Sequence, residues 1–142
     1  MKVKEIMNSP VEIISPDATI TQAAEMMKSF NIGVLPVEQG DNIVGTITDR
    51  DIAVRIVAQK LDPKSTAVKK AMSPHPVFCS EDTDIEEAAK MMEDKQIHRL
   101  VVLDSNNEVA GVLSTGDIAR KMKDEHILHE LMERICEPAY TH

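Results

Sequence analysis

The same pattern of residues occurs twice in this chain, 65 positions apart, and this duplication limits the folds that the chain can adopt. In the first copy the pattern includes Ile20, Ala23, Ala24, Met26 and Met27, and in the second it includes Ile85, Ala88, Ala89, Met91 and Met92. After one inserted residue, Gly45–Ile52 aligns with Gly111–Ile118. Duplicated units usually bury one face against each other. We therefore expect two similar subdomains, with a groove between them that can hold a ligand.

Each copy has the pattern of a β-α-β-β-α unit, so the predicted fold class is α+β (α/β). A short segment that contains proline precedes a helix whose apolar residues recur at i, i+3, i+4 and i+7. Thr19 with Gln22, and Asp84 with Glu87, have the spacing of helix caps with a reciprocal partner. Two apolar runs around a polar turn then indicate a hairpin in each copy. The predicted hairpin strands are 32–37, 43–47, 97–103 and 109–113.

The predicted boundaries follow the repeat: residues 1–61 form the first repeat, 62–66 a linker, 67–123 the second repeat and 124–142 a C-terminal helix with a tail. The linker, Asp62-Pro63-Lys64-Ser65-Thr66, has the composition of a turn. The C-terminal stretch keeps a helical spacing of apolar residues, and we expect it to dock on the body of the protein or on another chain. Those apolar residues are Ile127, Leu128, Leu131 and Ile135.

Composition excludes several classes of function. The chain has 42% hydrophobic residues and a net charge of −8, which predicts a globular protein without the basic surface that general nucleic-acid binding needs. No apolar run has membrane-spanning length, and no signal peptide is recognisable. Two cysteines without paired spacing indicate reduced thiols and no zinc site. We therefore expect a cytoplasmic protein that binds neither nucleic acid nor a membrane.

The motif with the most chemical content is Gly45-x-x-Thr48-x-x-Asp51, with its copy Gly111-x-x-Ser114-x-x-Asp117. In each copy a strand ends in a hydroxyl residue and a helix begins with a carboxylate. A carboxylate can accept two hydrogen bonds from neighbouring hydroxyls, which is what a ribose offers. The alternative is that these residues only cap helices. Because both copies keep the motif at matching places, the ligand interpretation is favoured.

With this repeat, the paired motif and the Ile32-x-x-Leu35-Pro36-Val37 strand, the chain resembles a tandem pair of CBS domains, also called a Bateman module. The resemblance covers about residues 1–122. It implies two repeats packed with pseudo-two-fold symmetry and regulatory binding of AMP, ADP or ATP, without a required cofactor. S-adenosylmethionine and dinucleotides are alternative ligands. The implied ribose contacts are Thr48 and Asp51 in one cleft, and Ser114 and Asp117 in the other.

The resemblance also implies where adenine and phosphate bind. Adenine would lie between Val11, Ile32 and Val112 in the Asp117 cleft, and between Thr46, Val77 and Ile97 in the Asp51 cleft. A His-Arg-Leu segment like that at His98 contacts phosphates in a nucleotide-sensing member of the family, so the predicted phosphate contacts are Arg50, His98 and Arg99. The alternative for His98 and Arg99 is a cross-strand salt bridge to a surface acid.

Because the first copy has Gly33 and Val34 in place of His98 and Arg99, and the second has Gly116 in place of Arg50, we expect unequal clefts. The Asp51 cleft should prefer a phosphorylated ligand, and the Asp117 cleft should be weak, empty or suited to a less charged adenosine compound.

Two other classes of function compete with the sensor. An enzyme is disfavoured, since no catalytic triad pattern and no Walker-type glycine loop are present. A structural dimerisation module with vestigial clefts is the remaining alternative. We expect a homodimer, with the alanines of both amphipathic helices suited to its interface, and a downstream protein partner that the sequence does not identify. A spacing that could hold a metal at His126, His129, Glu130 and Glu133 is read as the solvated face of a helix, so no metal site is predicted.

Overall fold

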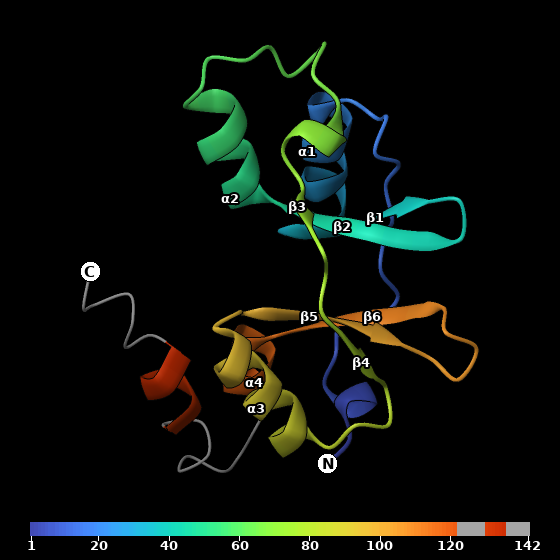
Figure 1. The fold of residues 1–142 in the computed structure, drawn as a ribbon, viewed down its shortest axis with the longest axis vertical. Helices are drawn as coiled ribbons and strands as arrows, with labels where there is room; N and C mark the ends of the chain where they lie inside the picture. The colour runs from blue at the N-terminus through green and yellow to red at the C-terminus, as the bar shows by residue number, and fades with distance from the viewer. Residues whose placement is uncertain (122–129, 136–142) are drawn as a thin grey trace. The chain divides into compact units, whose positions relative to one another are not determined.

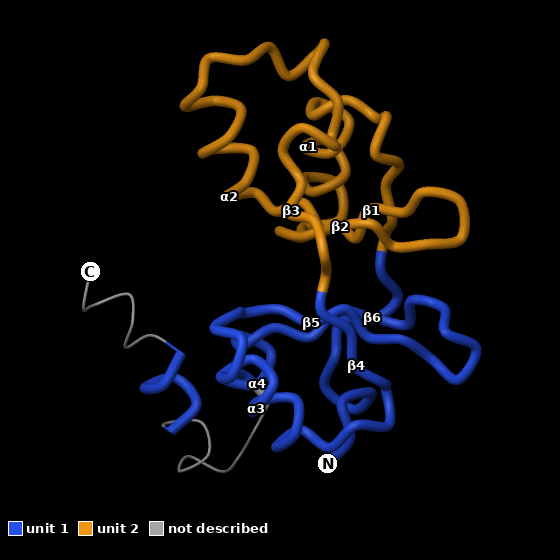
Figure 2. Tube along the Cα trace, in the orientation of Figure 1, with its two compact units in different colours: residues 1–11, 77–142 blue, residues 12–76 orange. Residues whose placement is uncertain are grey.

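The computed structural model describes residues 1–121 and 130–135, and it confirms the α+β class (Figure 1). The chain divides into two compact units (Figure 2). We call residues 12–76 the first-repeat unit, and residues 1–11 with 77–142 the second-repeat unit. Each unit is described by itself, and the expected pseudo-two-fold symmetry stays a prediction.

The first-repeat unit has three strands and a pair of helices on one side of them (Figure 1). Its sheet has the order β1-β2-β3, with antiparallel neighbours. Ile20, Ala23 and Met27 on the first helix pack against Leu35 and Ile47 of the sheet. The elements are α1 (Ile20–Phe30), β1 (Val34–Gln39), β2 (Asn42–Thr48), α2 (Asp49–Ile52), a π-helical turn that continues it (Ala53–Val57), a 3-10 turn (Val68–Lys70) and β3 (Ser73–Pro74).

The second-repeat unit has an equivalent hairpin, but its third strand lies beside the first hairpin strand and is parallel to it. Its sheet has the order β4-β5-β6, in which β4 is parallel to β5 and β6 is antiparallel to it. Ile85, Ala88 and Met92 pack against Leu100 and Leu113. The elements are a 3-10 turn (Val3–Glu5), β4 (Phe78–Ser80), α3 (Ile85–Lys95), β5 (Arg99–Leu103), β6 (Val109–Ser114) and α4 (Thr115–Lys121). The predicted hairpins are thus confirmed in both repeats.

The first strand predicted in each β-α-β-β-α unit is complete only in the second repeat. There Val101 N–H donates to Val77 O at 2.9 Å as β4 joins β5. In the first repeat the residue that corresponds to Val101 is Pro36, which has no N–H to donate. The strand is therefore reduced to one parallel bridge, between Ile14 and Val37.

The segment that precedes each repeat packs with the other repeat. The predicted boundaries at 1–61 and 67–123 do not show this exchange. Residues 1–11 belong to the second-repeat unit, while residues 67–76 belong to the first-repeat unit. The repeat alone could not reveal this, because both leading segments have the same pattern and each fits either unit.

Hydrogen bonds and burial hold each exchanged segment in place. Val3 N–H donates to Thr83 O at 2.8 Å, and the Val3 side chain is fully buried in the core of the second-repeat unit. In the same way Val68 N–H donates to Ala18 O at 2.8 Å, and Val68 is fully buried in the first-repeat unit. Each unit therefore depends on a segment that precedes the other repeat.

One predicted helix cap is confirmed and one is wrong. Thr19 and Gln22 form the reciprocal pair, since Gln22 N–H donates to Thr19 Oγ1 at 3.1 Å and Thr19 N–H donates to Gln22 Oε1 at 2.8 Å. Asp84 precedes α3 but its side chain accepts no capping hydrogen bond. The Asp84 carboxylate instead pairs with Lys2 Nζ at 3.1 Å, because the exchanged N-terminal segment runs alongside it.

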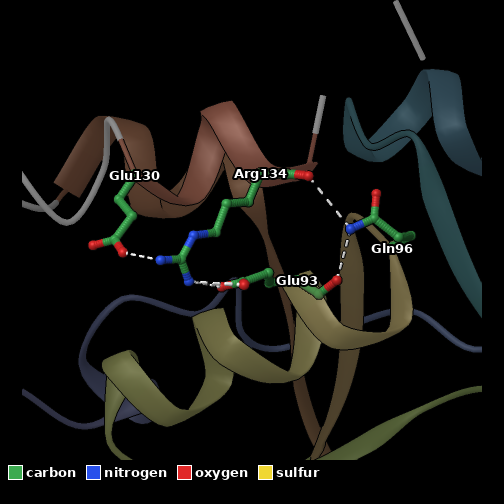
Figure 3. Close-up of polar contacts among 4 residues, drawn as sticks. All are labelled: Glu93, Gln96, Glu130 and Arg134. Carbon is green, nitrogen blue, oxygen red and sulfur yellow. Dashed lines mark hydrogen bonds and ion pairs between the residues drawn. The ribbon is translucent and has the colours of Figure 1, made fainter. Parts of the chain in front are cut away.

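The described part of the C-terminal stretch, residues 130–135, is helical and packs on the second-repeat unit. Leu131 and Ile135 are buried in its core, so docking on the body of the protein is confirmed for these residues. Figure 3 shows how Arg134 fastens the segment: its guanidinium donates to both Glu93 carboxylate oxygens, at 2.8 and 3.0 Å, and also pairs with Glu130. Ile127 and Leu128 lie outside the described residues. None of the helices in the described ranges is both long and apolar enough to cross a membrane.

Candidate functional site: two motif carboxylates

Thr48 and Asp51 form a reciprocal pair where β2 ends and α2 begins. Asp51 N–H donates to Thr48 Oγ1 at 3.0 Å, and Thr48 N–H donates to Asp51 Oδ2 at 3.0 Å. These bonds satisfy two backbone donors that a helix start leaves without partners. The Asp51 side chain remains 14% exposed. Its Oδ1 accepts no hydrogen bond from the described residues, and Arg55 Nε lies 3.9 Å away.

Ser114 and Asp117 form the same pair before α4, but the Asp117 carboxylate has further partners. Ser114 N–H donates to Asp117 Oδ2 at 2.9 Å, and Asp117 N–H donates to Ser114 Oγ at 3.1 Å. Asn8 Nδ2 donates to Oδ1 at 2.8 Å and to Oδ2 at 2.9 Å, while Arg120 Nη2 contacts Oδ1 at 2.5 Å. The Asp117 side chain is fully buried.

The two carboxylates therefore differ in their capacity to accept further hydrogen bonds. A carboxylate has about four lone-pair positions. At Asp117 all are used, two on each oxygen, by Asn8, Arg120 and Ser114. At Asp51 a single hydrogen bond from Thr48 is found among the described residues, so the other positions can serve a ligand. Both hydroxyl–carboxylate pairs cap helices, as the capping interpretation predicts. Among the described residues, the Asp51 carboxylate also keeps acceptor positions that no donor occupies.

Two arginines near Asp51 have different roles. Arg55 Nη1 donates to Ala71 O and Met72 O, both at 3.0 Å, so this side chain ties the helix to the segment before β3. The Arg50 side chain is exposed and makes no hydrogen bond or ion pair within residues 1–121 and 130–135. Arg50 therefore supplies an exposed positive charge one residue before Asp51 in the sequence, and this charge has no partner among the described residues.

The other predicted phosphate contacts, His98 and Arg99, lie in the second-repeat unit where β5 begins. Both residues are exposed. His98 O accepts from Thr115 N–H at 3.0 Å, and Arg99 pairs with Ser114 across the hairpin. Neither side chain forms an ion pair with a described residue, so the alternative of a cross-strand salt bridge is not observed in this part of the chain. Their action in one cleft with Asp51 stays a prediction.

The predicted adenine contacts are partly buried, with the exception of the buried Val112. Ile32 packs against the core of the first-repeat unit, and Val77 and Ile97 pack against that of the second. Each predicted pocket combines residues of both units, and this grouping stays a prediction. The first-repeat unit carries Ile32 and Thr46, and the second-repeat unit carries Val11, Val77, Ile97 and Val112.

Comparison with known proteins identifies the class of these two units. A family model described as the CBS domain matches residues 3–58 and again residues 68–124. The chain belongs to the CBS domain family. The CBS domain-containing protein YhcV of Bacillus subtilis (strain 168) is 40% identical over 117 residues, which make up 82% of this chain and 82% of that protein. Hypoxic response protein 1 of Mycobacterium tuberculosis (strain H37Rv) is 31% identical over 136 residues, covering 95% of this chain and 94% of that protein.

Solved structures agree with this assignment. The CBS domain pair of protein MJ0100, crystallised in complex with 5′-methylthioadenosine and S-adenosyl-L-methionine, superposes with a TM-score of 0.73 and 27% identity. The superposition covers 84% of this chain and 95% of that one. CBS domain pairs are generally regulatory modules that bind small ligands, and this is the class of function to which the chain belongs.

Sequence reasoning missed three residues that decide how these CBS motifs are arranged: Asn8, Arg120 and Arg55. A signal for two of them was present, because Asn8 aligns with Ser73 and Arg120 aligns with Val54 across the repeat. A polar residue in one copy facing a smaller or apolar residue in the other marks a difference between the two motifs. The sequence alone could not show that Asn8 contacts the second motif, because that contact requires residues 1–11 to belong to the second-repeat unit.

The expectation about helix alanines needs correction. Ala23, Ala88 and Ala89 are buried in the cores of their own units, so they cannot line an interface with a second chain. Of the four, Ala24 is exposed. Small residues on an amphipathic helix allow close packing against its own sheet as well as against a partner chain. The alanine pattern therefore could not distinguish a core position from an interface position.

Neither a metal centre nor an activated thiol is found in the described ranges. No cluster of three or more histidine, cysteine, aspartate or glutamate side chains occurs there, and His126 and His129 lie outside them. Burial, with a smaller contribution from the Glu87 charge, raises the pKa of Cys79 to about 11. Cys79 is therefore a neutral core thiol at physiological pH and not a nucleophile.

Proposed function

We propose that this CBS domain pair is a regulatory module that binds an adenine nucleotide such as AMP, ADP or ATP, with the Asp51 carboxylate accepting the ribose hydroxyls. The observation that carries the proposal is the spare acceptor capacity of Asp51, which is 14% exposed and has one hydrogen bond within the described residues. Thr48 holds that carboxylate in a fixed orientation, so a ligand would not have to order it.

The charge near Asp51 supports a phosphorylated ligand. Arg50 is exposed and without a side-chain partner in the described part of the chain, and a guanidinium can bind two phosphate oxygens at once. The bound compounds of the MJ0100 CBS pair support an adenosine ligand in general, and they keep S-adenosylmethionine among the candidates. A sulfonium is positively charged, however, and Arg50 would disfavour it relative to a phosphate.

The proposed role is regulatory and not catalytic. The motif offers a hydroxyl and a carboxylate, and these two groups can bind ribose without promoting a reaction. Regulation requires the nucleotide to bind two conformations, or two assembly states, with different affinity. A homodimer and a downstream protein partner remain part of the proposal as the elements on which such a difference would act.

The test is a thermal unfolding series with AMP, ADP, ATP, S-adenosylmethionine and NADH on the wild type and on Asp51→Ala. A ligand at about a hundred times its dissociation constant stabilises the fold by about 2.7 kcal/mol, which is a readily measured shift. Asp41→Ala is the matched control, because Asp41 is an exposed aspartate in the turn between β1 and β2.

We expect a shift with a phosphorylated adenine compound that Asp51→Ala abolishes and Asp41→Ala keeps. A 2′,3′-dideoxy analogue should give a smaller shift, because it lacks both hydroxyls that the carboxylate would accept. If none of the five compounds shifts the midpoint, the structural dimerisation module becomes the better interpretation. A shift that survives Asp51→Ala would contradict the assignment of this carboxylate.

A further inference from the structure

The strongest feature that the proposed function leaves unexplained is the pairing of Asn8 with Asp117. The Asn8 amide group donates to both oxygens of the Asp117 carboxylate, at 2.8 and 2.9 Å. We propose that Asn8 is an internal substitute for the ribose diol, which closes the second CBS motif and leaves Asp51 as the open one. The inference rests on the proposed function, since it assigns which motif carboxylate a nucleotide can use.

The chemistry of the contact supports this substitution. An amide NH2 offers two N–H donors, and the vicinal hydroxyls of a ribose offer two O–H donors. The Asn8 nitrogen lies opposite both carboxylate oxygens, so one of its N–H groups is shared between them and occupies an acceptor position on each, where the two hydroxyls of a diol would donate. The remaining positions at Asp117 are taken by Ser114 N–H on Oδ2 and Arg120 Nη2 on Oδ1. A diol could therefore reach Asp117 only by displacing Asn8 or Arg120.

The two partners of this contact differ in exposure, and the backbone of Asn8 is held in place. Asn8 is exposed, whereas the Asp117 side chain beneath it is fully buried. The Asn8 backbone is fixed by a pair of hydrogen bonds with Val112, from Asn8 N to Val112 O at 3.0 Å and from Val112 N to Asn8 O at 3.1 Å. Because the backbone is already held, pairing with Asp117 costs only the rotamer entropy of the Asn8 side chain, which favours the paired state.

The other repeat supplies the internal comparison. Ser73 pairs with Thr46 in the register in which Asn8 pairs with Val112, so Ser73 and Asn8 occupy equivalent positions. The serine side chain is shorter by one group and makes no hydrogen bond to Asp51. The two carboxylates thus differ in the residue on the strand segment beside them, and Arg120 adds a contact at Asp117 that Val54, its equivalent in the first repeat, cannot make at Asp51.

The reciprocal substitutions Asn8→Ser and Ser73→Asn test the inference, with AMP as the titrated ligand and calorimetry as the readout. Asn8→Ser gives the second motif the residue of the first, and we expect the stoichiometry to rise from about one to about two AMP per chain, because two acceptor positions become free. Ser73→Asn should weaken binding at Asp51 by at least about tenfold, because an amide then competes for the same oxygens. Asp117→Ala in the Asn8→Ser background should remove the added binding event.

The outcomes separate this inference from the proposed function. If the wild type binds one AMP through Asp51 but Asn8→Ser gains nothing and Ser73→Asn loses nothing, the proposed function stands and the inference is refuted. Two AMP bound per wild-type chain would refute it as well, since the second motif would already be open. If neither the wild type nor Asn8→Ser binds AMP, both fail. Binding by Asn8→Ser alone would support the closure by Asn8 and reject the role of Asp51.

Discussion

Replacing the two motif aspartates by alanine should destabilise the protein to clearly different extents in the absence of any ligand. At Asp51 the substitution removes one hydrogen bond, from Thr48 N–H to a carboxylate that is partly exposed. The expected loss is about 1 kcal/mol, typical of a helix-terminal hydrogen bond. At Asp117 it removes four hydrogen bonds to a carboxylate that is fully buried.

The loss at Asp117 is smaller than four full bonds, because some of the donors can turn to water. Asn8 is exposed and the Arg120 side chain is 65% exposed, so both can regain hydration. The remaining loss of unfolding free energy has three sources. They are the hydrogen bond from Ser114 N–H, the part of the Asn8 contact that water does not replace, and the cavity left by the buried side chain. We estimate about 3 kcal/mol, since hydrogen bonds to charged groups contribute about 1.5–3 kcal/mol each when they cannot be replaced.

Urea unfolding of Asp51→Ala, Asp117→Ala and the surface control Asp41→Ala measures the difference. With an m-value of about 2 kcal/mol/M, a difference of about 2 kcal/mol separates the two midpoints by about 1 M. A double-mutant cycle with Asn8→Ala should show coupling between Asn8 and Asp117 of about 1 kcal/mol. Equal losses for the two aspartates, or a larger loss at Asp51, would refute the count of hydrogen bonds on which this reasoning depends.

Three further predictions concern the parts that support the motifs. Gly111→Ala should lower the thermal midpoint more than Gly40→Ala, because a Cβ on Gly111 would lie 2.7 Å from Asn8 O, whereas Gly40 has φ of 64° but open space around it. Leu131→Ala should cost about 2–5 kcal/mol and release amide protection in residues 130–135, because Leu131 is a buried leucine on that segment. In a Cys136→Ser background, Cys79 should be alkylated far more slowly at pH 8 than after unfolding, because its pKa is raised to about 11 and little thiolate is present. Rapid alkylation of the folded protein would contradict the burial of that thiol.

Most of the secondary structure could be predicted because local signals determine it. Each hairpin follows from two apolar runs separated by a polar turn, and the Thr19 cap needs only a partner three residues away. The reduced first strand was not predictable in this way. It depends on Pro36 facing the strand that begins each repeat, and the pairing partner of a strand is not a local property.

The local geometry of the two motifs could be predicted, but the further partners of their carboxylates could not. The repeat identifies Asp51 and Asp117 as equivalent, and both do begin helices with the same reciprocal hydrogen bonds. The difference between them comes from Arg120 and from Asn8, which lies 109 positions before Asp117 in the sequence. Such a contact follows from the exchange of leading segments, and a short motif carries no information about it.

Capping and ligand binding were competing interpretations of the same motif, and the structure gives a reason to assign them to different copies. A carboxylate that caps a helix uses one acceptor position, which leaves capacity for a ligand unless other side chains take it. In the second repeat Asn8 and Arg120 take it, so we expect Asp117 to contribute to stability without a ligand. In the first repeat no described side chain donates a hydrogen bond to Asp51, although the polar neighbour Arg50 is free to bind an anion. The presence of the motif therefore does not by itself indicate a binding site, because the residues that face its carboxylate decide how many acceptor positions are left for a ligand.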